Sequence, residues 1–152
     1  MQHSTSAAGL AATIRAGCLG TRVGQLHRLV DRHFELHLRP LGLSVPQLEV
    51  LTALTLMAGP VKPSMLANTL GMERSTVSRN LAVLQSRGWV EPAEISTTGR
   101  SMSVRITHEG SAKLSAAGDA WTAAQAALVA TLGDDAAQCL DTWLTELTVM
   151  LD

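Results

Sequence analysis

The chain has 152 residues, of which 46% are hydrophobic and 16% charged, so we expect one ordinary folded domain and not a disordered chain. No apolar run approaches the roughly 20 residues of a membrane-spanning helix, and residues 1–8 lack the basic and apolar regions of a secretory signal. The two cysteines make neither a disulfide framework nor a zinc-ligand pattern. We therefore expect no metal, no cofactor, no membrane partner and a cytoplasmic location.

The net charge of −1 is unevenly distributed along the chain. The segment from Val61 to Thr107 carries +3, and the rest of the chain carries −4. A basic middle between acidic arms favours a protein that presents one face to a polyanion such as a nucleic acid.

The amino-terminal region predicts one long helix from about Ala7 to Leu38, ended by Pro40 and Gly42. Its apolar residues recur every three or four positions and so share one face; they are Leu19, Val23, Leu26, Val30 and Phe34.

A second helix is predicted to begin at Ser44 and to stop at Gly59-Pro60. Ser44 and Gln47 have the spacing of a capping box, and Pro46 is tolerated in a first helical turn. Its inward residues would be Leu48, Leu51 and Leu54.

Two shorter helices follow, over about Pro63–Leu70 and about Arg74–Arg87, with glycine stops at Gly71 and Gly88. The first would bury Leu66, Ala67 and Leu70, and the second Val77, Leu81 and Leu84. A short helix, a tight glycine-containing turn and a second helix with a polar outer face make a helix–turn–helix pattern.

The helical period then disappears, and two strands are predicted at Trp89-Val90 and Met102–Ile106 around a polar tip at 96–100. Thr107 would cap a fifth helix that runs to about Leu132, and a sixth would run from about Asp135 to Leu151. The fold class is therefore mainly α with a small β-hairpin wing, in a single domain over 1–152.

The terminal helices are each apolar on one face, although they lie at opposite ends of the sequence. They can bury those faces against each other or against a second chain. We expect residues 7–39 and 108–151 to form a homodimer and residues 44–107 to form a winged helix–turn–helix lobe that binds DNA.

The outer face of the helix at 74–87 carries the expected chemistry. Small hydroxyl side chains permit close approach to a major groove, and an arginine can bind guanine O6 and N7 together. Arg79 and the hydroxyls of Ser75, Thr76 and Ser78 are the predicted base and phosphate contacts, and Arg74 the backbone contact.

The hairpin adds two further expected DNA contacts. Arg100, at the polar tip beside Gly99, would enter the minor groove, and Arg105 would point outward towards the DNA backbone. A winged helix that binds a protein partner remains an alternative, and the polar outer face of the preceding helix is the feature that favours DNA.

Three stretches resemble the MarR family of bacterial winged-helix regulators: Leu66–Arg79, Leu84–Val90, and Arg100 with Ile106–Gly110. The resemblance covers essentially the whole chain, except that Thr98 stands where the family usually has Asp. It implies a homodimeric repressor of a pseudo-palindromic operator in double-stranded DNA. It also implies release by a small phenolic or other lipophilic effector bound between the dimer helices and the DNA-binding lobe.

The sequence also offers two alternatives to a small-molecule effector, a redox signal and a metal ion. Some family members sense peroxides through a cysteine near the first helix, which makes Cys18, with Cys139, a candidate redox pair. His33 and His37 have a spacing that can hold Zn²⁺, and His108-Glu109 could add ligands, but charged neighbours favour a solvated face. The sequence contains no catalytic or phosphate-binding motif, so we do not expect an enzyme.

Overall fold

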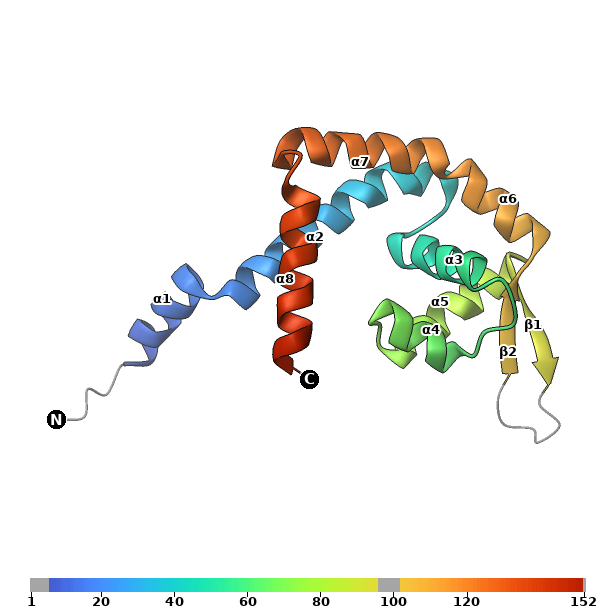
Figure 1. Cartoon of the computed structure of the whole chain (residues 1–152), viewed down its shortest axis with the longest axis horizontal. Helices are drawn as coiled ribbons and strands as arrows, with labels where there is room; N and C mark the ends of the chain where they lie inside the picture. The colour runs from blue at the N-terminus through green and yellow to red at the C-terminus, as the bar shows by residue number, and fades with distance from the viewer. Residues whose placement is uncertain (1–5, 96–101, 152) are drawn as a thin grey trace. The chain divides into compact units, whose positions relative to one another are not determined.

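The computed structural model describes residues 6–95 and 102–151, and it confirms a mainly helical fold with one two-stranded hairpin (Figure 1). The chain divides into two compact units, Met1–His33 and Phe34–Asp152. In chain order the elements are α1 (Ala7–Gly17), α2 (Leu19–Leu38), the 3-10 turn η1 (Arg39–Leu41), α3 (Val45–Met57), α4 (Pro63–Leu70), α5 (Arg74–Ser86), β1 (Val90–Ile95), β2 (Met102–Ile106), α6 (His108–Ala116), α7 (Gly118–Leu132) and α8 (Ala136–Leu151).

The first unit corrects the prediction of one unbroken helix from Ala7 to Leu38. Cys18 adopts an extended conformation (φ −71°, ψ 116°) and separates α1 from α2. Its N–H closes the last turn of α1 on the carbonyl of Ile14 (3.0 Å). Glycines at 17 and 20 lower the helix propensity on both sides of this break, an effect that apolar periodicity does not register.

The core of the second unit lies where α3, α4 and α5 pack together with the hairpin (Figure 1). Its largest fully buried side chains come from each of these helices and from the end of α2; they include Leu38, Leu51, Leu54, Leu66, Val77 and Leu84. Burial of a leucine or valine side chain stabilises a fold by about 1.5–3 kcal/mol, so this cluster is the main source of stability for the helix–turn–helix segment.

The start of α3 follows the prediction in detail. The Gln47 N–H donates to Ser44 Oγ (3.4 Å) and the Ser44 N–H donates to Gln47 Oε1 (3.2 Å), which completes the capping box. The helix ends at Met57, earlier than the Gly59-Pro60 stop, because Ala58 turns the chain with φ 50°.

The hairpin is longer on its first strand than predicted. The sequence indicated only Trp89-Val90, but β1 continues to Ile95 and pairs antiparallel with β2. Within β1, Pro92 cannot donate a hydrogen bond to the ladder because proline has no N–H. The structure accommodates it beside a bulge, where the register shifts between Pro92 and Glu94.

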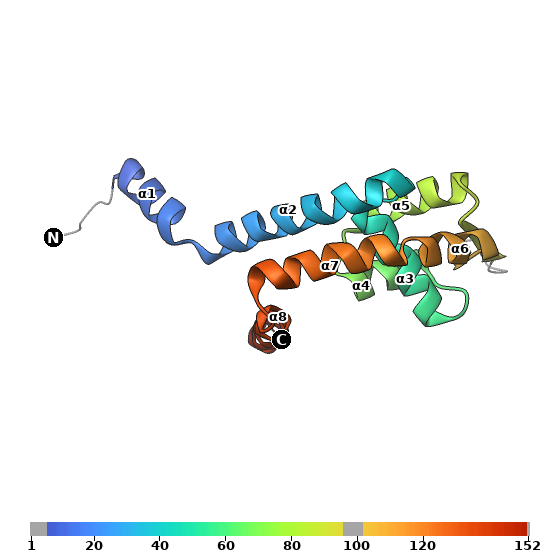
Figure 2. The same ribbon diagram turned by 90° about the horizontal axis from the view of Figure 1, so that it is seen from above.

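The predicted helix from Thr107 to Leu132 is two helices, α6 and α7, which run almost in line in the view from above (Figure 2). The break falls at buried Ala117, which retains near-helical angles (φ −82°, ψ −9°), and its N–H donates to the carbonyls of both Lys113 and Leu114. Because the backbone hardly departs from helical geometry, the apolar period passes through the break.

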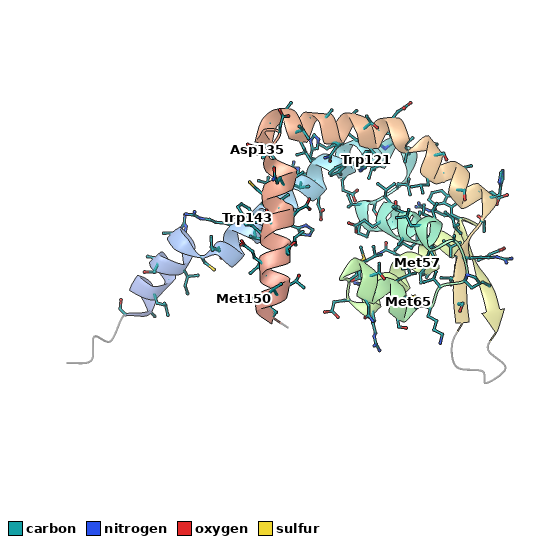
Figure 3. All side chains as sticks on the ribbon, in the orientation of Figure 1. Met57, Met65, Trp121, Asp135, Trp143 and Met150 are labelled. Atoms are coloured by element: carbon teal, nitrogen blue, oxygen red, sulfur yellow. The ribbon has the colours of Figure 1, made fainter. Side chains whose placement is uncertain are left out.

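Helix α8 is amphipathic, and its apolar side chains are exposed in the single chain. Leu140, Trp143, Leu144 and Leu147 are 42%, 54%, 64% and 51% exposed. Trp143 and Met150 can be followed along this helix in Figure 3. Exposed apolar faces of this extent mark surfaces that bind something else.

A search of the described residues for helices long and apolar enough to cross a membrane finds no single helix. One bent pair, Leu19–Leu41 with Val45–Met57, meets the length and composition criteria together.

Candidate nucleic-acid interface

Helix α5 is oriented by its apolar stripe. Val77, Leu81 and Leu84 are buried against the core, as predicted. At 100° per residue this burial turns the opposite face of the helix to solvent. The preceding α4 ends at Gly71, whose left-handed conformation (φ 61°) makes the tight turn between the two helices.

The structure leaves the predicted DNA-contact residues of α5 accessible. Arg74, Ser75, Ser78 and Arg79 are exposed, and Thr76 is half-buried. Arg79 Nη2 donates to Thr76 Oγ1 (3.4 Å), which turns the guanidinium back towards the first turn of the helix. The cationic group and the small hydroxyls therefore cluster at one end of one helix face.

That end of α5 is also a helix N-terminus. Glu73 occupies the N-cap position, and within the described residues its side chain makes no capping hydrogen bond. The first-turn N–H groups of an uncapped helix are left to water or to an anion, and the helix dipole favours negative charge there. Arg74 lies in the same turn as these N–H groups, so a cation and uncapped donors share this end of the helix.

The hairpin is joined to the helix–turn–helix segment by an isolated bridge. The Val61 N–H donates to the Val104 carbonyl (2.8 Å) and the Val104 N–H donates to the Val61 carbonyl (2.9 Å). Val61 and Val104 are both buried, so the strands cannot slip past α4 without breaking these bonds and exposing the core.

Arg105 points outward, as its alternation with buried Val104 predicted. The structure adds a partner that the sequence analysis missed: Glu91, directly opposite on β1, whose Oε1 lies 2.7 Å from Arg105 Nε. The pair could have been predicted only from the register of the hairpin, because that register places Glu91 directly opposite Arg105. Arg100, the predicted minor-groove residue, lies outside the described residues.

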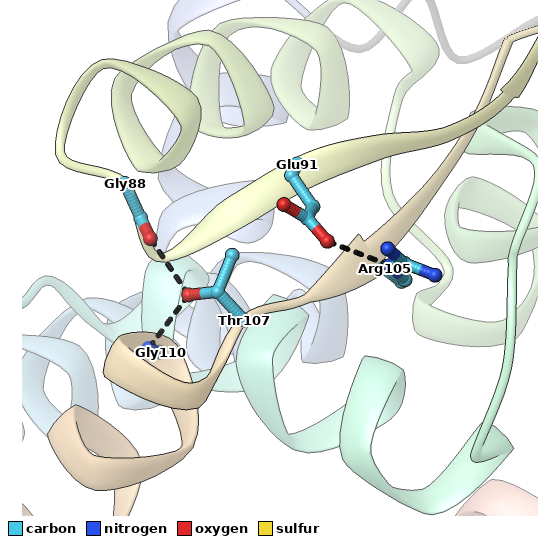
Figure 4. Close-up of polar contacts among 5 residues, drawn as sticks. All are labelled: Gly88, Glu91, Arg105, Thr107 and Gly110. Atoms are coloured by element: carbon cyan, nitrogen blue, oxygen red, sulfur yellow. Dashed lines mark hydrogen bonds and ion pairs between the residues drawn. The ribbon is translucent and has the colours of Figure 1, made fainter.

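Thr107 connects the end of α5, the hairpin and the start of α6 (Figure 4). Its hydroxyl donates to the Gly88 carbonyl (2.6 Å) and accepts from the Gly110 N–H (3.0 Å), while its N–H donates to the Trp89 carbonyl (3.0 Å). We call these four residues the Thr107 junction. The sequence predicted Thr107 as a helix cap, and the link to Gly88 is additional.

Two cations lie over the indole ring at this junction. The Arg87 guanidinium is 5.0 Å, and the Lys113 ammonium 5.1 Å, from the centroid of the Trp89 ring. Arg87 also donates to the carbonyl of Gly42. These cation–π contacts stabilise the position of α6 beside α5, and nothing in the linear sequence indicated them.

The two cysteines differ in their surroundings. Cys18 is half-buried and Cys139 is exposed. A hydrogen bond from the Thr21 side chain, together with backbone N–H groups, lowers the pKa of the Cys18 thiol below its ordinary value. The described residues contain no group of three or more His, Cys, Asp or Glu side chains placed to hold a metal ion.

Comparison with known proteins finds similarity in the segment that contains the helix–turn–helix and the hairpin. Residues 41–101, which span α3 to the hairpin, match the model of the MarR family. The M. tuberculosis regulator MosR in complex with DNA is 27% identical and superposes with a TM-score of 0.74 over 88% of this chain and 97% of that one. The family match covers the helix–turn–helix and hairpin segment, and the structural similarity to MosR extends over most of the chain.

Further solved structures and one curated protein are similar to this chain. A point mutant of E. coli MarR in complex with operator DNA is 24% identical, with a TM-score of 0.77 over 89% of this chain and 96% of that one. CouR from Rhodococcus jostii RHA1, bound to p-coumaroyl-CoA, is 21% identical, with a TM-score of 0.73 over 87% and 92%. The transcriptional regulator PecS of Dickeya dadantii (strain 3937) is 29% identical over 93 residues, which span 58% of this chain and about half of PecS (56%).

Proposed function

We propose that this chain belongs to the MarR family and is a sequence-specific, DNA-binding transcriptional regulator. The observation that carries the proposal is the polar face of α5, which is turned to solvent because Val77, Leu81 and Leu84 hold the opposite face in the core. Arg79 would read a base, and Arg74 would bind a phosphate with the first-turn N–H groups. The remaining proposed contacts are Ser75, Thr76 and Ser78 on α5, and Arg100 and Arg105 on the hairpin.

Two of the structural relatives support this role, because MosR and the MarR mutant were each solved with DNA. In the proposed complex, residues 44–107 form the DNA-binding lobe. A winged helix that binds a protein would be expected to expose an apolar face on α5, and the exposed residues at its N-terminal end are charged or hydroxylated.

The active form would be a homodimer built by residues 7–39 and 108–151. The exposed leucines of α8 support this, as do Leu10, Ile14, Leu19 and Val23 in the first unit, which are 48–74% exposed. A two-fold dimer places two copies of α5 on half-sites about one helical turn apart, which requires a pseudo-palindromic operator. Sedimentation equilibrium should give twice the 16.1 kDa chain mass, and a monomer at micromolar concentration would contradict it.

Repression relieved by a small molecule completes the proposal. CouR was solved bound to p-coumaroyl-CoA, a ligand that carries a phenolic acyl group, and this supports a small-molecule effector. A ligand bound between the dimer helices and the DNA-binding lobe would favour a spacing of the two lobes that does not fit DNA. The coupling free energy between ligand and DNA binding needs to be only about 1–3 kcal/mol. That difference lowers DNA affinity about 5–150-fold.

The deciding experiment is fluorescence anisotropy with an operator selected from random duplexes, at about 50 and 200 mM salt, against a scrambled duplex. We expect nanomolar binding that exceeds binding to the scrambled duplex roughly a thousandfold. Arg79→Ala should weaken binding, whereas Arg32→Ala, which removes the same charge outside residues 44–107, should not. Failure of the selection to enrich any sequence, with weak salt-sensitive binding only, would contradict the proposal and favour a protein partner.

A thiol-based signal is a second candidate because the pKa of Cys18 is lowered by Thr21. A lowered pKa increases the thiolate fraction, which is the form that peroxides oxidise. If the signal is a redox signal, oxidation of Cys18, with Cys139 as the second thiol of the pair, would release the protein from DNA. Treatment with an organic hydroperoxide should then weaken operator binding by the wild-type protein and spare Cys18→Ser; unchanged affinity of the wild type would exclude it.

A further inference from the structure

Glu91 and Arg105 form an ion pair on the outer face of the hairpin (Figure 4). They stand directly opposite each other on β1 and β2, and their neighbours Val90 and Val104 are each buried on the other face. Glu91 Oε1 lies 2.7 Å from Arg105 Nε, and the two side chains are 46% and 55% exposed. The pair therefore lies at the surface, and one of its members is the proposed backbone contact Arg105.

The backbone beneath this pair is held on both strands. Val104, next to Arg105, exchanges two hydrogen bonds with Val61, at 2.8 and 2.9 Å. The register is regular at Glu91, and the bulge falls after it, between residues 92 and 94. Side chains directly opposite each other on antiparallel strands have Cβ atoms about 4.5–5.5 Å apart. A fixed backbone therefore keeps the carboxylate beside the guanidinium.

The contact is made through Nε, the guanidinium nitrogen nearest the aliphatic stem of Arg105. A guanidinium has five N–H donors, and the four on its two terminal nitrogens form the end that can bind two phosphate oxygens. Glu91 thus restricts the orientation of Arg105 through its near nitrogen, and this contact does not use the terminal nitrogens.

The carboxylate also changes the charge that DNA would meet at this position. An arginine alone attracts any phosphate backbone, whatever its sequence, and such contacts supply non-specific binding. With a carboxylate 2.7 Å from Nε the pair has no net charge, so it attracts DNA little at distances beyond the Debye length of about 8–10 Å. Arg79 on α5 differs, because its Nη2 donates to the neutral hydroxyl of Thr76 and that contact leaves its charge intact.

We propose that Glu91 is a positioning residue for Arg105 and a determinant of DNA specificity. It lowers the attraction of Arg105 for every duplex, and it retains the short-range hydrogen bonds that Arg105 makes when a phosphate lies at the right distance and angle. A duplex whose backbone fits the hairpin gains those hydrogen bonds, and one that does not fit gains neither them nor the attraction of a free charge. The inference rests on the proposed function, because it gives Glu91 a part in the same DNA interface.

Glu91→Gln tests the inference, because it removes the charge and keeps the size of the side chain. An exposed ion pair contributes little to stability, so this variant should fold. Arg105 should then act as a further phosphate contact, which steepens the dependence of log K on log salt by up to about 0.9 per chain. Between about 50 and 200 mM salt, such a change makes the loss of affinity for a scrambled duplex about threefold larger. Affinity for the selected operator should rise less than affinity for the scrambled duplex, so the ratio of the two should fall at least about threefold.

Two further variants serve as controls. The double variant Glu91→Gln/Arg105→Gln keeps the net charge of the wild type, so its salt dependence and its affinity for the scrambled duplex should match the wild type. Its affinity for the operator should fall, because the hydrogen bonds of Arg105 are lost. Glu109→Gln, an equal charge change at an exposed position on α6, should leave the ratio of the two affinities unchanged.

An unchanged salt dependence in Glu91→Gln would show that Glu91 does not neutralise Arg105 and would overturn the proposal. Equal gains of affinity on both duplexes would overturn the role in specificity. A loss of stability in urea, with salt dependence unchanged, would assign Glu91 a structural role instead. Failure of the proposed function is a different result, in which the wild type itself selects no operator; the salt dependence on the scrambled duplex still tests the neutralisation in that case.

Discussion

Gly110→Ala should destabilise the protein even though alanine is the better helix former. Alanine in place of glycine gains about 1 kcal/mol in a helix interior. At position 110, however, the new Cβ would lie 2.1 Å from the Trp89 carbonyl oxygen and 2.9 Å from Ile106 Cγ1. That carbonyl oxygen is fixed by the Thr107 N–H, so α6 must move away from Trp89 and from the end of β2 to relieve the overlap.

The net cost can be worked from these contacts. Forced overpacking costs about 1–3 kcal/mol, and displacing α6 also weakens the Thr107 hydrogen bonds to Gly88 and Gly110, worth about 0.5–1.5 kcal/mol each. After subtraction of the helix-propensity gain, we expect a loss of about 1–5 kcal/mol in the free energy of unfolding. Urea unfolding followed by tryptophan fluorescence measures it, and Tm should fall by about 2–4 °C per kcal/mol.

A second glycine in the chain serves as the matched control. Gly118 begins α7 without a positive φ, and a Cβ built there meets no atom within 4 Å among the described residues. Gly118→Ala should leave stability unchanged or raise it by up to about 1 kcal/mol. If Gly110→Ala proves as stable as Gly118→Ala, the close approach of α6 to Trp89 is not present in solution and the reasoning fails.

Three further predictions concern the interface and the thiol. Arg79→Ala should cost about 1–3 kcal/mol of operator binding and relax specificity at one base pair, measured by anisotropy on single-base operator variants; equal weakening on every sequence would make Arg79 a phosphate contact instead. Both side chains of the Glu91–Arg105 pair are about half exposed. A double-mutant cycle measured by urea unfolding should therefore give a coupling free energy of about 0–1 kcal/mol that decreases with added salt. A coupling free energy that does not change with salt would contradict the assignment as a screened surface pair. Because a lowered pKa populates the Cys18 thiolate at lower pH, the midpoint of its alkylation rate should lie below that of a free cysteine and should move up in Thr21→Val; an unmoved midpoint would show that Thr21 does not stabilise the thiolate.

The middle of the fold could be predicted because its signals are local. Ser44 with Gln47 and the glycine at 71 specify where helices begin and end through hydrogen bonds within a few residues, and the stripe Val77–Leu81–Leu84 fixes the buried face. The accessible residues of α5 follow from that burial. Their assignment to bases or phosphates stays a prediction.

What the sequence could not supply depends on tertiary geometry or on the conformation of single residues. Two helix breaks each involve one residue: Cys18 becomes extended (ψ 116°), whereas Ala117 keeps near-helical angles. The extension of β1 through Pro92 depends on a bulge, which propensity does not anticipate. The partner of Arg105 required the strand register, and the cations over Trp89 required the position of α6.

The Thr107 junction also has a mechanical consequence. Because one threonine fastens the C-terminal end of α5 to α6, a tilt of α6 is transmitted to the far end of α5, where Arg74 and Ser75 lie. A helix of 13 residues is about 20 Å long, so a tilt of about 5° displaces that end by nearly 2 Å. Hydrogen bonds to base edges tolerate only a few tenths of an ångström. The junction thus couples α6 to α5, and in the proposed complex a tilt of this size would move the predicted contact residues of α5 out of hydrogen-bonding range of the DNA.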